Sequence, residues 1–189
     1  MNALPMINEA TFDDLLALPE HERNELIDGV IVCQASPRLP HQAGQGALYK
    51  RLCRSFHEGD GGPEDPGGWV FLLQPELHLG RNAFIPDIAA WRLPRNPQPS
   101  PTYYTELTPD WVCELLSPST ERMDRLRKFD LYAQAGVAHY WIVNPDLQTL
   151  EVYALDGACY KRVASTEGSE LGCFQPFDAV ALDLARCWL

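Results

Sequence analysis

Residues 111–144, WVCELLSPSTERMDRLRKFDLYAQAGVAHYWIVN, contain three consecutive elements that together decide the fold. The run WVCELLS (111–117) is almost continuously apolar, which is typical of a strand buried on both faces of a sheet. The segment 120–136 has helical spacing and ends at Gly136, a residue type that commonly follows a helix. HYWIVN (139–144) has the composition of a second strand. This order predicts a sheet with a helix packed on it.

The flanking sequence extends this pattern in both directions. Asp28-Gly29 between apolar flanks predicts a hairpin, and Thr11, which resembles the start of a capping box, predicts a short helix after it. A longer helix is expected from His41, with an end at Gly59. Further strands are expected at residues 69–79, with an interruption at Pro75, and at 84–92, 149–155 and 159–164, and a proline-rich surface loop at 94–109.

Length and composition fit one globular domain. At 189 residues, with 46% apolar and 22% charged residues, the chain is long enough for one core and short for two domains. We therefore predict a single α/β (α+β) domain over residues 1–189, in which a mixed sheet packs against helices. Its core spans about residues 10–155, and further strands lie in residues 156–189.

The sequence carries no signal for a membrane, a secretory route or a structural zinc site. It has no apolar stretch of about 18 residues, and its N-terminus lacks a basic start and an apolar core. The six cysteines include no C-x-x-C pair, so we expect reduced thiols in a soluble, cytoplasmic protein.

The formal net charge of −11 argues against a broad surface for binding nucleic acid. Two helices nevertheless carry local basic clusters, which could form basic edges around an acidic centre. These clusters are Lys50, Arg51 and Arg54, and Arg122, Arg125, Arg127 and Lys128. Acids intersperse the second cluster at Glu121, Asp124 and Asp130, so a solvated helix face with internal ion pairs is the default interpretation.

Asp87 and Glu114 each place one carboxylate in an otherwise apolar run. A lone buried carboxylate is costly, and two of them on neighbouring strands cannot both stay ionised without a cation. A hard divalent ion such as Mg²⁺ would resolve this conflict, because it accepts one or two protein carboxylates together with waters and a substrate phosphate. The alternatives are that Asp87 caps a turn after Pro86 or bonds backbone amides at a strand entrance, and that Glu114 pairs with an arginine.

Lys128 is the third member of the predicted constellation. Met123, Leu126, Phe129 and Ala133 form one apolar stripe that can pack on the sheet. Lys128 belongs to a second stripe with Leu131, Tyr132 and Ala135, so it is expected to point inward, although it could instead extend its ammonium group to solvent. Two acids, a lysine and a metal ion are the parts needed to hydrolyse a phosphodiester.

The stretch IPD (85–87), followed by residues 113–145, resembles the PD-(D/E)xK superfamily of restriction-endonuclease-like nucleases, and within it the Uma-two family. The resemblance covers roughly residues 10–155. It implies a restriction-endonuclease-like fold and phosphodiester hydrolysis that depends on Mg²⁺ (or Mn²⁺) held by Asp87 and Glu114. The hypothesis built on it takes DNA as the substrate and adds the carbonyl of Leu115 as a further metal ligand. One departure is that Leu116 replaces the lysine expected two positions after Glu114, and the resemblance assigns that role to Lys128.

The resemblance also suggests accessory residues and leaves alternatives open. Glu25 matches an acid that could complete the metal shell, or it could be an exposed hairpin residue. His41 could begin a helix beside the site or be an ordinary surface histidine, and Tyr132 could be an accessory group or core packing. The leading hypothesis is a DNA endonuclease, for which analogy with other nucleases suggests a homodimer. The alternatives are a noncatalytic interaction module and a hydrolase of small phosphodiesters.

Overall fold

The computed structural model describes residues 9–19, 22–34, 36–57, 62, 66–98, 102–169 and 171–188. The helical elements are α1 (Phe12–Leu16), α2 (Leu39–Leu52), the π-helical η1 (Cys53–His57) and η2 (Met123–Lys128), α3 (Phe129–Gln134) and the 3-10 turn η3 (Leu184–Arg186). The strands are β1 (Asn24–Ile27), β2 (Val30–Cys33), β3 (Trp69–Leu73), β4 (Glu76–Leu79), β5 (Asn82–Phe84), β6 (Ile88–Arg92), β7 (Tyr104–Thr105), β8 (Trp111–Leu115), β9 (His139–Asn144), β10 (Thr149–Asp156), β11 (Cys159–Glu167), β12 (Leu171–Gly172) and β13 (Leu182–Asp183).

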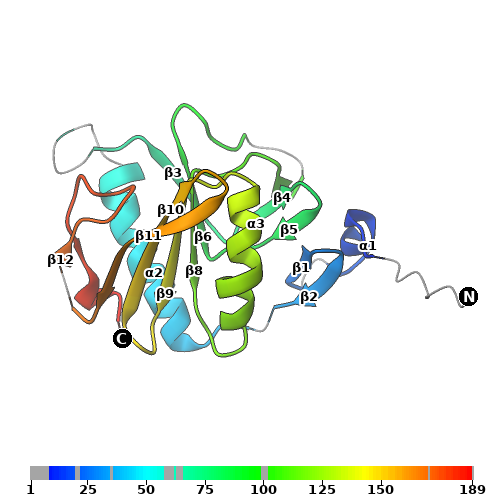
Figure 1. Cartoon of the computed structure of the whole chain (residues 1–189), viewed down its shortest axis with the longest axis horizontal. Coiled ribbons are helices and arrows are strands. Elements are labelled where there is room, and N and C mark those ends of the chain that lie inside the picture. The colour runs from blue at the N-terminus through cyan, green and yellow to red at the C-terminus, as the bar shows by residue number, and fades with distance from the viewer. Residues whose placement is uncertain are drawn as a thin grey trace, which may run out of the picture.

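The central sheet has six strands in the order β11-β10-β9-β8-β6-β3. β8 and β9 are parallel, as the crossover through η2 and α3 allows, whereas β6 pairs antiparallel with β8. Figure 1 shows α2 behind this sheet and α3 in front of it. The mixed α/β fold predicted from the sequence is therefore confirmed, with helices on both faces of the sheet.

Residues of β8 alternate between two apolar cores. Trp111, Cys113 and Leu115 pack in the core that contains Leu48 and Leu52 of α2. Val112 packs in the other core, with Leu131 and Tyr132 of α3. Because successive side chains of a strand point to opposite faces, Glu114 shares the α3 face with Val112. The nearly continuous apolar run of β8 follows from burial on both faces.

A second, five-stranded sheet, β2-β1-β5-β4-β7, lies beside the central one (Figure 1). Its β1–β2 hairpin turns at Asp28 and Gly29, which have φ angles of 50° and 75°, so the Asp-Gly hairpin prediction is confirmed. The predicted interruption at Pro75 is also confirmed, but it separates two sheets: β3 joins the central sheet and β4 the second one. Gln74, with φ of 50°, redirects the chain there.

The helix before β9 differs from the sequence prediction in one respect. Leu126, which was expected to pack on the sheet, is 55% exposed, whereas Lys128 is 2% exposed. The reason is that residues 123–128 are π-helical, with a wider turn than the α-helical period used to define the first stripe. The second stripe therefore faces inward. Gly136 ends this helix with φ of 80°, as predicted.

Two smaller predictions also have an outcome. The loop at 94–109 contains the two-residue strand β7, which pairs in parallel with β4. The expected end of the second helix at Gly59 lies outside the described residues, and within them the helix continues through η1 to His57. None of the helices in the described part of the chain is long and apolar enough to span a membrane.

Candidate functional site

Asp87 directly precedes β6, and Glu114 lies on the neighbouring strand β8. The β6–β8 pairing reaches Ile88 and Cys113, the residues next to these two acids in the chain. Both acids are buried, with exposed fractions of 8% and 3%. Both side chains line one pocket, so the two acids lie together as the sequence predicts. The alternative that Asp87 bonds a backbone amide at a strand entrance also holds for one of its oxygens, because Oδ2 accepts a hydrogen bond of 2.7 Å from the backbone N–H of Leu115 on β8.

Lys128 joins Glu114 to two further acids. Its Nζ lies 3.1 Å from Glu114 Oε1 and 2.9 Å from Glu25 Oε1. The third contact, of 3.4 Å, is with Asp124 Oδ1 one helical turn earlier. Lys128 does not extend to solvent, and the partner of Glu114 is this lysine and not an arginine.

Glu25 reaches this cluster from the second sheet. It lies on β1, in the segment that follows α1, and is 2% exposed, so the exposed-hairpin alternative is wrong. Its Oε1 also accepts a hydrogen bond of 2.7 Å from the backbone N–H of Ile85, which fixes the segment that leads to Asp87. Glu25 thus connects the two sheets through Lys128.

The ionisation of the cluster is set by burial and by an excess of acids. Burial opposes the charge of Lys128, but Glu114, Glu25 and Asp124 outweigh that effect and raise the pKa of Lys128 well above its ordinary value.

Burial and the neighbouring carboxylates raise the pKa values of Glu114 and Asp124. Burial raises the pKa of Glu114 well above its ordinary value, and repulsion from the neighbouring carboxylates adds to it against the attraction of Lys128. Burial likewise raises the pKa of Asp124. Because buried carboxyl groups outnumber the ammonium group, the cluster favours taking up a proton or a further cation.

His41, Gln45 and Tyr132 hold the two central acids in place. His41 Nε2 lies 2.9 Å from Asp87 Oδ1, and Gln45, one turn further along α2, donates to the backbone carbonyl of Asp87 at 2.8 Å. The Tyr132 hydroxyl donates to Glu114 Oε1 at 2.9 Å. Tyr132 is fully buried, so it is both core packing and a hydrogen-bond donor to the site. His41 lies at the site and is not an ordinary surface residue.

Some of these side chains line a small pocket of about 40 Å³, whereas Glu25, Gln45 and Tyr132 are not among its lining residues. It is lined by Asp87, Glu114, Leu115, Asp124 and Lys128, and its remaining walls are Arg23, Gln34, Pro37, His41, Ile85 and Thr120. Within the described residues, no group of three or more His, Cys, Asp or Glu side chains is arranged to hold a metal ion. The oxygen donors nevertheless suit Mg²⁺, which needs only one or two carboxylates and completes its shell with water.

A sequence model of the Uma2 family, described as "Putative restriction endonuclease", matches residues 11–185. The chain belongs to the Uma2 family. Its fold matches the crystal structure of "a putative nuclease belonging to DUF820" from Anabaena variabilis ATCC 29413, with a TM-score of 0.73 and 22% sequence identity. The match covers 94% of this chain and 97% of the other. At that identity the likeness shows a shared fold. A comparison with curated proteins finds no match.

Sequence reasoning missed two residues at the site of this Uma2 chain. Asp124 was assigned to a solvated helix face but is 2% exposed, and its spacing of four residues from Lys128 was the available signal. Gln45 follows His41 by four residues, so the two share one face of α2, and that spacing alone did not distinguish it from an ordinary helix residue.

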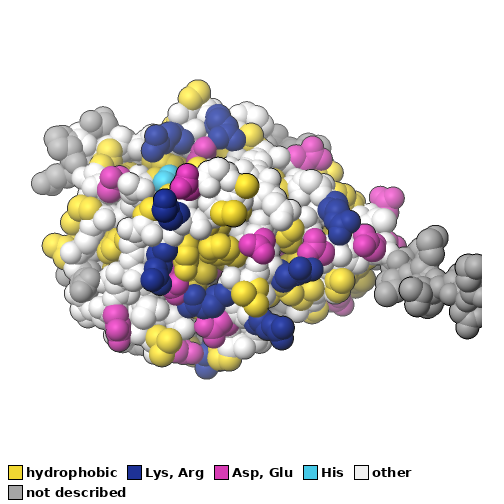
Figure 2. Space-filling view, in the orientation of Figure 1, with side chains coloured by type: hydrophobic (Ala, Val, Ile, Leu, Met, Phe, Trp, Pro, Cys, Tyr) yellow, Lys and Arg dark blue, Asp and Glu magenta, His cyan; other side chains and the backbone are white. Residues whose placement is uncertain are grey.

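The surface of the Uma2 chain has no continuous basic patch on the face in Figure 2, where basic and acidic side chains are interspersed. Arg125 pairs with Glu121 at 2.9 Å and with Glu151 at 2.7 Å. Arg127 pairs with Asp28 at 2.7 Å. The interpretation of internal ion pairs is therefore confirmed for Arg125, while Arg127 pairs with an acid of the β1–β2 turn. Asp124 and Lys128 of the same helix are buried.

Proposed function

We propose that this Uma2 protein is a metal-dependent endonuclease that hydrolyses phosphodiester bonds in DNA. The observation that supports this most directly is the excess of buried carboxyl groups around Lys128, in a pocket that Asp87 and Glu114 both line. Replacing every member of a buried ion-pair cluster with apolar residues often stabilises a fold. The presence of the cluster therefore favours a chemical role over a structural one. The family match and the shared fold support the same class of function.

Asp87 and Glu114 are the residues that would hold Mg²⁺ or Mn²⁺, and the carbonyl of Leu115 is the proposed third protein ligand. When bound, such an ion lowers the pKa of a water molecule and offsets negative charge on the phosphate. His41 and Gln45 fix the position of Asp87, and Tyr132 and Lys128 fix that of Glu114. Lys128 also keeps the cluster from becoming too negative to admit a phosphate.

A second candidate is hydrolysis of small phosphodiesters. It is favoured by the pairing of Arg125 and Arg127 with acids, which leaves the helix beside the site with less free positive charge for a polynucleotide. A small pocket and a net charge of −11 are also smaller obstacles for a small substrate than for a duplex.

The test is to incubate the purified protein with plasmid and with single-stranded DNA in Mg²⁺ and in Mn²⁺. We expect cleavage by the wild type, none in chelator, and none by Glu114→Gln, which keeps the acceptor for Lys128 and Tyr132. Asp156→Asn, an exposed acid on β10, is the matched control and should cleave normally. Turnover of a chromogenic diester without cleavage of DNA would support the second candidate. Inactivity on every substrate, together with no binding of Mn²⁺ in calorimetry, would contradict both.

A further inference from the structure

We propose that Arg23 is the phosphate-binding residue of the pocket and contacts a non-bridging oxygen of the substrate phosphodiester. This inference rests on the proposed function of the same site. It adds a contact for an anion to a site in which the lysine is already paired with three carboxylates.

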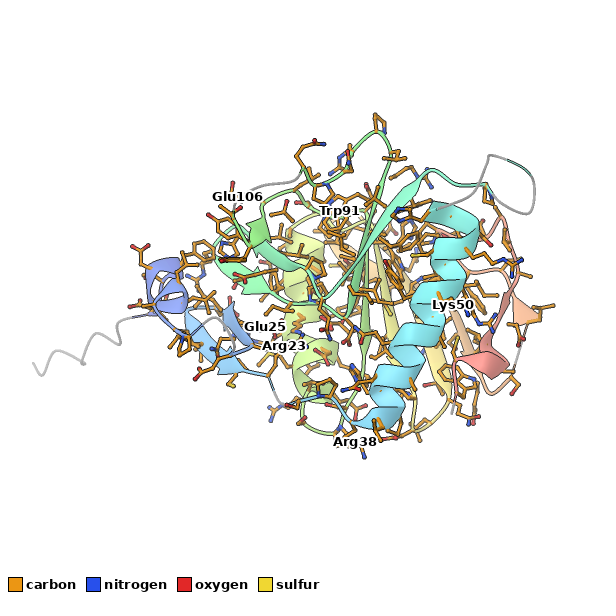
Figure 3. All side chains as sticks on the ribbon, turned by 180° about the vertical axis from the view of Figure 1, so that it is seen from behind. Arg23, Glu25, Arg38, Lys50, Trp91 and Glu106 are labelled. Atoms are coloured by element: carbon orange, nitrogen blue, oxygen red, sulfur yellow. The ribbon has the colours of Figure 1, made fainter. Side chains whose placement is uncertain are left out.

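Arg23 is placed at the pocket by the start of the β1 strand. It directly precedes Asn24 and lies two residues before Glu25, so the alternation of an extended chain puts Arg23 and Glu25 on the same side. Arg23 lines the pocket together with Asp87, Glu114 and Lys128. Figure 3 shows Arg23 next to Glu25, with Arg38 at the start of α2 lower in the view.

Arg23 is also the cation of the pocket that is left free for a ligand. The ammonium group of Lys128 is shared among three carboxylates, and His41 contacts Asp87. In the part of the chain that the structure describes, the guanidinium of Arg23 makes no side-chain hydrogen bond or ion pair, although acids line the same pocket. Arginines such as Arg38, Arg95, Arg125 and Arg127 are all paired.

The N-terminus of α2 adds a second positive contribution beside Arg23. Pro37 and His41, on either side of the first helical residues, line the pocket. The N-cap residue of this 14-residue helix, Arg38, makes no side-chain cap hydrogen bond, since its guanidinium has no acceptor atom, and it pairs with Asp146 at 2.7 Å. The positive end of the helix therefore raises the potential on this side of the pocket.

The positive charge of Arg23 would offset an electrostatic repulsion in the proposed reaction. A phosphodiester is an anion, and the carboxylates of the pocket repel it. A guanidinium presents donors in a planar fork that matches two phosphate oxygens, which an ammonium group cannot reproduce. Arg23 would thus select for a phosphodiester and orient it, while the acids remain available to a metal ion.

The experiment compares wild type, Arg23→Gln, Arg23→Lys and the control Arg162→Gln, which removes an exposed arginine of β11 outside this pocket. Steady-state cleavage of a single-stranded oligonucleotide in Mn²⁺ gives KM and kcat. For Arg23→Gln we expect KM to rise about ten- to a hundredfold, the range for one hydrogen-bonded charge contact. Arg23→Lys should fall between it and wild type, and Arg162→Gln should match wild type.

A second measurement separates this inference from the proposed function. Inorganic phosphate, added with Mg²⁺, should raise the thermal unfolding midpoint of the wild type and of Arg162→Gln but not that of Arg23→Gln. The midpoint without phosphate should be unchanged in all three. If the wild type cleaves DNA while Arg23→Gln keeps its KM and its response to phosphate, the inference is wrong and the nuclease proposal stands. If cleavage is absent but the phosphate response depends on Arg23, the nuclease proposal is wrong and the anion site stands. No phosphate response in the wild type overturns the inference.

Discussion

Asp87 ties its own segment to the strand that carries Glu114, because its Oδ2 accepts a hydrogen bond of 2.7 Å from the backbone N–H of Leu115. One carboxylate oxygen thus serves the sheet, while Oδ1 lies 2.9 Å from His41 Nε2 at the edge of the pocket. Structural and chemical roles of this side chain can therefore be separated by substitution.

We expect the Asp87→Asn variant to fold but to lose most of its cleavage activity. The amide oxygen can still accept from Leu115, so the free energy of unfolding should fall by no more than about 1–3 kcal/mol. Loss of a metal-binding charge should lower cleavage roughly a hundredfold or more. Urea unfolding and a plasmid cleavage assay measure the two effects, with Asp156→Asn as the control. A variant that keeps wild-type cleavage would remove Asp87 from the proposed mechanism.

Lys128→Met should be strongly destabilising, because it leaves the buried acids Glu25, Glu114 and Asp124 without their ammonium partner. Breaking a buried ion pair from one side typically costs about 3–5 kcal/mol. The control is Lys161→Met, which removes an exposed lysine paired with Asp156 and should change stability little. Adding Glu25→Gln to Lys128→Met should restore part of the loss. An additive double variant would contradict direct coupling between these two residues.

Glu114 should give the metal-free protein a characteristic dependence on pH. Its folded-state pKa is raised well above the ordinary value by burial and by neighbouring acids, so the folded state favours the protonated form. Its contribution to stability is present in full below pH 4.5, the ordinary pKa, and is lost as the pH rises above that value. In chelator, urea unfolding from acidic to neutral pH should show a smaller loss for Glu114→Gln than for wild type. Equal slopes would contradict the raised pKa.

Tyr132→Phe tests the hydrogen bond to Glu114 alone, since the ring is kept in the core. We expect a loss of about 1 kcal/mol in the free energy of unfolding, the usual net value of one such bond. Cleavage should fall less than in Glu114→Gln, because Lys128 still contacts the same oxygen. The comparison is Tyr153→Phe, which removes a hydroxyl that donates to Glu151 in a partly buried position outside the site. Wild-type stability of Tyr132→Phe would show that this bond adds nothing.

The two central acids were predictable because each interrupts an apolar run that a buried strand requires. Lys128 was predictable as an inward residue because its helical neighbours on one stripe are apolar. Asp124 was missed because the mixed charges of this segment are typical of a solvated face, although its spacing of four residues places it beside Lys128. The contact between Glu25 and Lys128 also could not be predicted. It links a strand of the second sheet to the helix that packs on the central sheet, and it depends on how the chain divides between the two sheets at Gln74.

The strand register and the division into two sheets could not be predicted for a related reason. WVFLLQPELHL reads as one interrupted strand, and nothing local shows that its halves pair with different partners. Pairing is decided by the summed fit of many side chains across strands, which a single sequence does not display.

The wide helical turn of Met123–Lys128 makes the site tolerant of one change in chain length. A π-helical turn holds more residues than an α-helical one, so removing one residue between Asp124 and Lys128 would allow a regular α-helix. The two side chains would then be three residues apart, and residues at that spacing are neighbours on a helix surface. A relative that is one residue shorter at this point could therefore keep both groups at the centre.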